Sequence, residues 1–231
     1  NSNYNYGFEA HHYRGRVNFE NYSEYNGCLF QIFFHKSERS SNITNLNTEE
    51  DDLYNFALIN PWVANISSPQ FSEDPKILYN INQSVYLNDG VIGQTGDSLV
   101  FNWGIPFSNY NSAITYKSNF SPAKFLSTYC PAGNNCSANP DATIPEGLFL
   151  NQENGEFIFT PIGNNETSTR VLEVEQWRDI NGTKTLVGKV RRDVLAITIS
   201  ENSNNSPTIT VNDTYNICAG QKFNLNLDIK D

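Results

Sequence analysis

The segment from Ile144 to Pro161 constrains the fold of this chain more than any other. It reads Ile-Pro-Glu-Gly-Leu-Phe-Leu-Asn-Gln-Glu-Asn-Gly-Glu-Phe-Ile-Phe-Thr-Pro, two short apolar runs around an Asn-Gly pair. Leu148 and Leu150 share one face of the first run, and Phe157 and Phe159 share one face of the second, because side chains alternate along a strand. The Asn-Gly pair supplies the positive φ angles of a tight turn. The segment therefore predicts a β-hairpin with an apolar face.

The composition favours an all-β protein. A chain of 231 residues exceeds the usual size of one sandwich and suggests about two modules that each bury a core. Gly, Pro, Asn and Ser recur every few residues, and no stretch keeps a helical period for more than a turn or two. We expect residues 66–200 to form one antiparallel β-sandwich. Its predicted core consists of Leu99, Phe101, Trp103, Leu148, Leu150, Phe157, Phe159 and Leu172.

A second hairpin is predicted late in the chain. Two strand-like runs, 171–178 and 184–200, flank the Asn181-Gly182 pair, which is a strong turn signal.

The charge balance argues against a nucleic-acid partner. The formal net charge is −10 at pH 7, whereas phosphate binding needs clustered Lys and Arg. The basic cluster Lys189-Val-Arg-Arg192 is better explained as the solvated end of a strand. No apolar run is long enough to cross a bilayer as a helix.

Cysteine spacing predicts one short disulfide. Cys130 and Cys136 enclose a Pro-Ala-Gly-Asn-Asn loop that a disulfide can close, and such a bond suits an oxidising exterior. Zinc would need further thiols or histidines nearby, and the sequence has none there. Cys28 and Cys218 lie in apolar, strand-like runs, so we expect both to be buried thiols.

Changes of pattern near the start define an N-terminal β-module at residues 1–65. Two aromatic-rich runs, 13–20 and 28–36, are typical of paired strands. The polar stretch 37–52 indicates an exposed loop. An Asn-rich link near residue 65 marks the predicted boundary with the sandwich.

An internal repeat continues past the sandwich. A Ser-Pro pair begins it at Ser68, followed by Tyr-Asn-Ile and an alternating strand, and a similar series begins at Ser206. The second series stops at Asp231, so we expect residues 201–231 to be the opening strands of a further repeat. This arrangement predicts tandem modules within a longer parent chain.

Three ordered motifs resemble a family of surface proteins. They are Gly96-Asp-Ser-Leu-Val-Phe101, the Pro-Gly-Leu core within Ile144 to Pro161, and Glu173-Val-Glu-Gln-Trp-Arg178 with Arg191-Arg-Asp193. The Pro-Gly-Leu core is similar to that of Ig-like and cadherin-like domains. The order of the motifs resembles the large secreted surface proteins of Bacteroidota that are associated with gliding motility.

This resemblance implies Ig/cadherin-like antiparallel β-sandwich modules in tandem on the outside of a bacterial cell. It implies export by the type IX system and a non-catalytic role in adhesion or display, for some members as gliding adhesins. The implied partners are adjacent repeats of the parent chain, the type IX secretion and outer-membrane motility machinery, and surface polysaccharide.

The cadherin-like resemblance also implies calcium at loops or module junctions. Calcium takes about six to eight oxygen ligands, and in the loop from Asn88 to Asp97 only Asp89 and Asp97 are acidic. An Asx-turn that fixes a hairpin accounts for so sparse a pair better than a cation site does. We therefore expect no tightly bound cofactor, with Asp89 and Asp97 as the calcium candidates.

The residues that a hydrolase needs are not arranged for catalysis. Glu173 and Glu175 share a strand face with Val171 and Trp177, which is more typical of a solvated strand than of a glycosidase acid and base. A serine hydrolase needs a histidine late in the chain, and no histidine follows His35. We expect no enzymatic activity.

Aromatic residues interleaved with Asn and Ser indicate a second candidate function. Phe107, Tyr110, Tyr116 and Phe120 lie in the long stretch 106–142, and flat rings with neighbouring amides are what a carbohydrate-binding loop uses. The alternative is that these rings pack back on the sandwich. An exposed aromatic platform would favour a lectin-like module over a display module.

Overall fold

Strands dominate the structure, a computed structural model that describes residues 11–40, 42–47, 52–131, 133, 136–200, 208–210, 214, 222–225 and 227–230. Of the described residues, 44% lie in strands and 4% in helix, which confirms the all-β class. The helical residues belong to η1 (Phe19–Tyr25), a 3-10 helix in which the Glu20 amide donates to the side chain of the capping residue Asn18. No helix in this part of the chain is long and apolar enough to cross a membrane.

The strands are short except for one hairpin near the end of the sandwich. They are β1 (Phe30–Lys36), β2 (Leu53–Ile59), β3 (Gln70–Phe71), β4 (Leu78–Asn80), β5 (Val85–Asn88), β6 (Val91–Ile92), β7 (Ser98–Trp103), β8 (Phe107–Asn109), β9 (Ser112–Ala113), β10 (Leu148–Leu150), β11 (Glu156–Phe159), β12 (Thr167–Ile180), β13 (Thr183–Ile199), β14 (Thr208–Thr210) and β15 (Asp228–Lys230).

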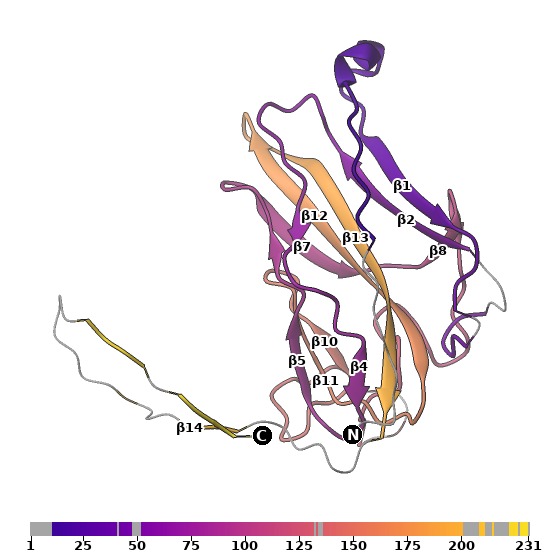
Figure 1. Ribbon diagram of the computed structural model, residues 1–231, viewed down its shortest axis with the longest axis vertical. Coiled ribbons are helices and arrows are strands. Elements are labelled where there is room, and N and C mark those ends of the chain that lie inside the picture. Colours follow the sequence, from indigo (N-terminus) through magenta and orange to yellow (C-terminus); the bar gives the residue numbers. More distant parts are fainter. Residues whose placement is uncertain are drawn as a thin grey trace.

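The large sheet is built on the β12–β13 hairpin, which runs through most of the body in Figure 1. Its strand order is β7-β12-β13-β2-β8-β9, with β1 paired to β2 and β4 paired to β13. The β4–β13 ladder is parallel, and the other ladders of this sheet are antiparallel. Asn181 and Gly182 have φ angles of 54° and 80°, so they form the tight two-residue turn that suits twisted strands.

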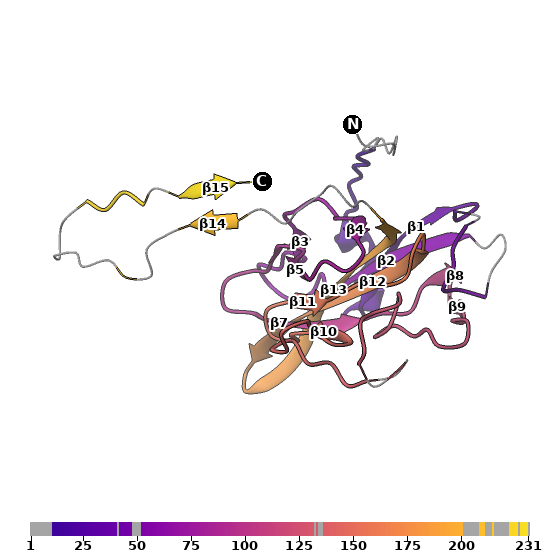
Figure 2. The ribbon, with the colours of Figure 1, turned by 90° about the horizontal axis from the view of Figure 1, so that it is seen from below.

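A small sheet of order β10-β11-β5 completes the sandwich at the end of the molecule opposite η1 (Figure 1). Figure 2 shows β1 and β2 on one side of the β12–β13 hairpin and β7 on the other. Between the two sheets, Phe157 and Phe159 of β11 pack against Tyr79 of β4 and Ala196 of β13. Burying such side chains stabilises the fold by about 1.5–3 kcal/mol each.

The predicted core is confirmed. Five of its members are buried, namely Phe101, Leu148, Phe157, Phe159 and Leu172, and the other three, Leu99, Trp103 and Leu150, are half-buried and pack against the same clusters. Sequence reasoning missed Phe125 and Leu126, which are fully buried in this core. The stretch 106–142, predicted as a long surface excursion, therefore contributes to the interior.

The β10–β11 connection is longer than the predicted tight turn. It runs over residues 151–155, and the Gly155 amide donates to the Asn151 carbonyl at 2.9 Å. Gly155 has a φ of 78°, whereas Asn154 is not among the residues with positive φ. A Cβ at Gly155 would lie 2.5 Å from the ring of Phe101. Glycine is required here by both backbone conformation and close packing.

The large sheet crosses the module boundary that the sequence suggested near residue 65. Ile59 of β2 pairs with Gly188 of β13, and Leu58 pairs with Lys189. The N-terminal strands therefore belong to the sandwich itself, with β2 inside the large sheet and β1 at its border. The predicted strand at 13–20 does not form, since residues 11–18 have no regular structure and η1 begins at residue 19.

The polar stretch 37–52, predicted as an exposed loop, contains buried residues. Ile43 and Leu46 belong to a small apolar cluster, and Asn45 is fully buried. The Asn45 amide donates to the carbonyls of Phe125 and Thr169 at 2.8 and 2.9 Å, and its oxygen accepts from the Thr169 amide at 3.0 Å. One polar side chain therefore joins three segments that lie far apart in the sequence.

The last strands form a ladder of their own. Thr208 to Thr210 of β14 pair with Asp228 to Lys230 of β15. Much of the predicted further repeat at 201–231 lies outside the described residues, as does Cys218. The other cysteine expected to be a buried thiol, Cys28, is exposed, which corrects that prediction.

Candidate binding surface

Asp89, the first calcium candidate, is held by arginine. The two terminal nitrogens of Arg170 donate to its two carboxylate oxygens at 2.9 and 3.1 Å, and Arg192 lies 3.7 Å away. Both members of the Asp89–Arg170 pair are buried. Such a bidentate pair occupies the carboxylate oxygens that a calcium ion would need.

Asp97, the second calcium candidate, has the same kind of partner. Arg178 donates to its two oxygens at 2.6 and 2.9 Å, and Gln176 donates to one of them. The hydrogen bond from Arg178 lowers the pKa of Asp97 more than burial raises it. The structure does not bring Asp89 and Asp97 into a metal site, and the described residues contain no group of three or more metal-binding side chains.

Glu173 and Glu175 contact cations on the neighbouring strand. Lys189 lies 2.9 Å from Glu175 and 3.4 Å from Glu173, and Arg191 donates to Glu173 at 2.8 Å. Burial opposes the charge of Lys189, but the hydrogen bond and charge of the two carboxylates outweigh it and raise the Lys189 pKa. These carboxylates link β12 to β13 and do not face each other across a cleft.

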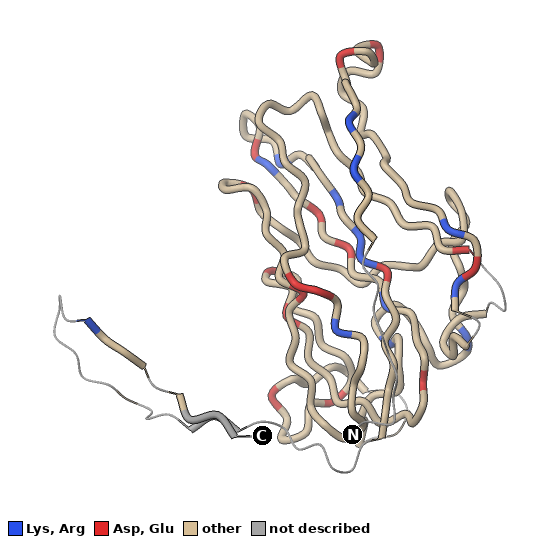
Figure 3. Tube along the Cα trace, in the orientation of Figure 1, with Lys and Arg blue, Asp and Glu red and all other residues tan. Residues whose placement is uncertain are grey.

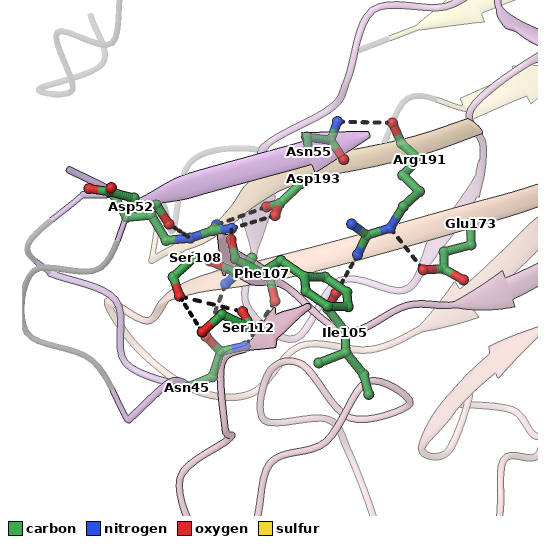
Figure 4. Close-up of polar contacts among 12 residues, drawn as sticks. Asn45, Asp52, Asn55, Ile105, Phe107, Ser108, Ser112, Glu173, Arg191 and Asp193 are labelled. Atoms are coloured by element: carbon green, nitrogen blue, oxygen red, sulfur yellow. Dashed lines mark hydrogen bonds and ion pairs between the residues drawn. The ribbon is translucent and has the colours of Figure 1, made fainter. Parts of the chain in front are cut away.

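Arg191 is packed between two aromatic rings. Its guanidinium carbon lies 4.5 Å from the ring centroid of Phe56 and 4.9 Å from that of Phe107. It also donates to the Ile105 carbonyl and to Glu173, as Figure 4 shows. Cation–π contacts of this kind contribute about 0.5–2 kcal/mol each. Through these contacts Arg191 of β13 links strands β2 and β8 to the centre of the sheet.

Arg39 ties the N-terminal part of the chain to β13. It donates to both oxygens of Asp193 at 3.0 and 2.6 Å, and also to the carbonyls of Asp52 and Phe107. The two charged side chains are 5% and 2% exposed, so the pair is shielded from solvent. Removing one member of such a pair leaves an uncompensated buried charge, which costs about 3–5 kcal/mol.

The four aromatic residues predicted to bind a ligand do not form a platform. Phe107 packs edge-on against Phe56 at 5.7 Å, and Tyr116 packs against the small apolar cluster, where burial raises its pKa. Phe120 is half-buried, while Tyr110 is 63% exposed at the β8–β9 turn. Two of the four rings, those of Phe107 and Tyr116, therefore pack back on the sandwich.

The predicted disulfide between Cys130 and Cys136 is present. Both cysteines line an open pocket of about 450 Å³ together with Lys124, Thr128 and Leu148. The disulfide therefore closes one wall of a surface hollow at the edge of the β10–β11 sheet.

An exposed apolar surface, which sequence reasoning missed, lies on β1. Ile32, Phe33 and Phe34 are 54%, 61% and 46% exposed, and these three residues are called the β1 patch below. An open hollow of about 350 Å³ beside the patch is lined also by Phe56 and Phe71. Adjacent exposed apolar residues of this size are uncommon on soluble monomers and usually mark an interaction site.

The signal for this patch is visible in the sequence. Strands with one solvated face alternate apolar and polar residues, but Ile-Phe-Phe places apolar side chains on both faces. Figure 3 shows acidic residues spread over much of the molecule, yet β1 itself contains no Asp or Glu. The patch is thus locally apolar and free of negative charge on a protein whose net charge is −10.

The comparisons with known proteins give no relative. No family model matches the chain, and no match is found among curated proteins or solved structures. The resemblance to gliding-associated surface proteins therefore stays a prediction.

Proposed function

We propose that this chain is a non-catalytic adhesion or display module on a bacterial cell surface. The observation that carries the proposal is the position of β13 in the sheet. This strand of 17 residues has β12 along one side and both β2 and β4 on the other, and the chain continues from it toward residue 201 and beyond. A tension applied through that connection would load β13 along its axis.

Loading along a strand is the geometry that resists force best. The hydrogen bonds on both sides of β13 would be sheared together, whereas a strand peeled from an edge loses them one at a time. Ion pairs reinforce the same strand, because Lys189 and Arg191 pair with Glu173 and Asp193 pairs with Arg39. Forced unfolding is governed by the unfolding rate, which such cross-links are expected to lower.

The compartment and partners follow from the same proposal. The Cys130–Cys136 disulfide supports an oxidising location, because such bonds persist mainly outside the cytoplasm. The module would be exported by the type IX system and would act with adjacent repeats and the outer-membrane motility machinery. Surface polysaccharide is the proposed adhesion ligand class.

The test is adhesion under flow. Beads coated with the protein would be perfused over glass coated with acidic polysaccharide and over bare glass, and their detachment measured as flow increases. We expect retention on at least one surface and no turnover of glycoside, ester or peptide substrates. Retention that free sugar abolishes would show that the adhesion ligand is polysaccharide, and turnover would contradict the proposal.

A matched pair of variants tests whether β13 resists the applied force. Asp193→Asn removes one charge of a buried pair in the loaded strand, whereas Asp179→Asn changes an exposed residue near the hairpin tip. Beads coated with Asp193→Asn are expected to bind at rest but to detach at lower flow than beads coated with Asp179→Asn. Equal detachment of the two variants would contradict a mechanical role for β13.

A further inference from the structure

The outer edge of β1 has no partner strand among the described residues. All seven residues of β1 pair with β2, from Phe30 opposite Ile59 to Lys36 opposite Leu53, and no other described strand pairs with β1. Figures 1 and 2 show β1 at the border of the large sheet, beyond β2. A free edge presents unpaired N–H and C=O groups, which are a template for another strand.

This edge lacks the usual protection against pairing. Edge strands are commonly blunted by proline, by a bulge or by a charge pointing into the edge. β1 contains no proline, its register with β2 is unbroken, and its only lysine, Lys36, is its last residue. Tyr13 packs on the ring of Phe34 with centroids 5.9 Å apart, but it is itself 78% exposed.

The sequence of β1 is complementary to itself. If two copies pair antiparallel about a two-fold axis at Phe33, then Phe33 lies opposite Phe33, and Ile32 lies opposite Phe34. Gln31 then faces His35, and Lys36 faces Phe30, so no like charges meet. Cross-strand apolar and aromatic pairs contribute about 0.2–1 kcal/mol each, and this register places three of them side by side at its centre.

We propose that β1 is a homotypic docking edge, at which the β1 strands of two copies pair antiparallel about Phe33. The sheet of each copy would continue into that of the other. β1 itself brings no acidic residue to the contact, and the nearby Asp52 carboxylate lies 2.8 Å from the His35 ring. This inference goes beyond the proposed function and does not depend on it, because self-association is measured without any adhesion surface.

The first experiment measures oligomeric state. Sedimentation velocity over roughly a hundredfold range of protein concentration should show a monomer–dimer equilibrium that follows mass action. Raising the salt concentration should strengthen the dimer, because salt screens the repulsion between two copies of charge −10. A monomer throughout the range would overturn the proposal, even if the monomer bound an added extended peptide at β1.

Variants locate the contact. Ile32→Lys and Phe33→Lys should each weaken self-association at least about tenfold, because a charge in the pairing edge opposes strand addition. Ile92→Lys is the matched control, since Ile92 is 63% exposed in β6, and it should dimerise like the original chain. The Phe33 ring stacks on Tyr54, so Phe33→Lys alone could weaken the dimer by disturbing the fold. Ile32→Lys tests the same edge without removing that contact. Unchanged dimerisation in both edge variants would overturn the assignment.

Cross-linking tests the register. With Cys28 replaced by serine, Phe33→Cys places two thiols opposite each other at the two-fold axis, within the reach of a disulfide. Lys36→Cys is the control, because the proposed register separates its two thiols by about 20 Å. We expect mild oxidation to join the Phe33→Cys copies much faster. Equal rates for the two variants would contradict the two-fold at Phe33.

Discussion

At the scale of single residues, asparagine has two distinct structural roles in this protein. Among the described residues other than glycine, it supplies most of the left-handed backbone positions, at Asn65, Asn82, Asn111, Asn119, Asn165 and Asn181. Asparagine tolerates this conformation better than other residues with a side chain. Asn45 has the second role, as a buried amide that bonds to the backbone of Phe125 and Thr169. The high asparagine content, 34 residues, therefore reflects turns as well as solubility.

Replacing Asn45 tests its role in joining segments. Asn45→Ala removes three hydrogen bonds in a fully buried position, and each buried group left unpaired costs about 1–3 kcal/mol. We expect a loss of at least about 3 kcal/mol in the free energy of unfolding, measured by urea denaturation. Asn47→Ala is the control, because Asn47 also makes two hydrogen bonds but is exposed to water. A loss as large in the control would show that burial does not set the cost.

At the scale of secondary-structure elements, the two main hairpins need glycine for different reasons. Gly182 at the β12–β13 turn has a φ of 80° and open space around its Cα. Gly155 at the β10–β11 connection has a similar φ of 78°, but a Cβ there would lie 2.5 Å from the buried ring of Phe101. The first turn constrains only the backbone, and the second constrains the packing of the core as well.

Alanine at each glycine separates these two effects. Gly182→Ala should lower the free energy of unfolding by about 1–2 kcal/mol, the cost of a left-handed alanine. Gly155→Ala should cost the same plus about 1–3 kcal/mol of overpacking against Phe101. Thermal and urea unfolding of both variants measure the difference. Equal losses would mean that the Phe101 ring moves aside freely.

Sequence patterns predict the elements that alternate regularly and end in turn residues. The hairpins around Gly155 and Gly182 are of this kind, and their apolar faces form the core. The stretches 37–52 and 106–142 were misassigned because each inserts only a few apolar residues into a polar background, which leaves no period to detect. The strand predicted at 13–20 alternates well but has no place in the sheet, so tertiary packing overrides its propensity.

Ion pairs between residues that are distant in the sequence limit how much of the candidate site the sequence can predict. The cadherin-like resemblance made Asp89 and Asp97 the calcium candidates because they are the acidic residues of their loop, while the arginines that bind them lie 81 residues later. No local pattern connects residues so far apart. The β1 patch was also missed, although a local pattern could have predicted it, because three adjacent apolar residues in a strand cannot all face one core.

At the scale of the whole molecule, residues before and after position 65 share one sheet and one set of ion pairs. Without the first 65 residues, β13 would lose its β2 neighbour, and Asp193 would lose Arg39. By contrast, β14 and β15 pair with each other. The cooperatively folding unit therefore begins before residue 66, where the sequence suggested that the sandwich starts.

Two truncations test this unit. The fragment 66–231 should lack a cooperative thermal transition, because Asp193 becomes a buried unpaired charge and the sheet loses two strands. The fragment 1–200 should keep the transition within a few degrees of that of the full chain. Near-ultraviolet circular dichroism follows both. A cooperative transition in the first fragment would restore a module boundary near residue 65.

The bond between Arg39 and Asp193 also fixes the order in which the protein can fold. The two residues are 154 positions apart, and long separations slow folding because loop closure must precede the contact. At about 5–20 residues per second, β2 would wait on the order of ten seconds for β13 to be synthesised. During that time β13 is not yet available to pair with β2, and the apolar side chains of Ile32, Phe33 and Phe34 remain exposed. The nascent chain must therefore be kept from aggregating until β13 has been synthesised.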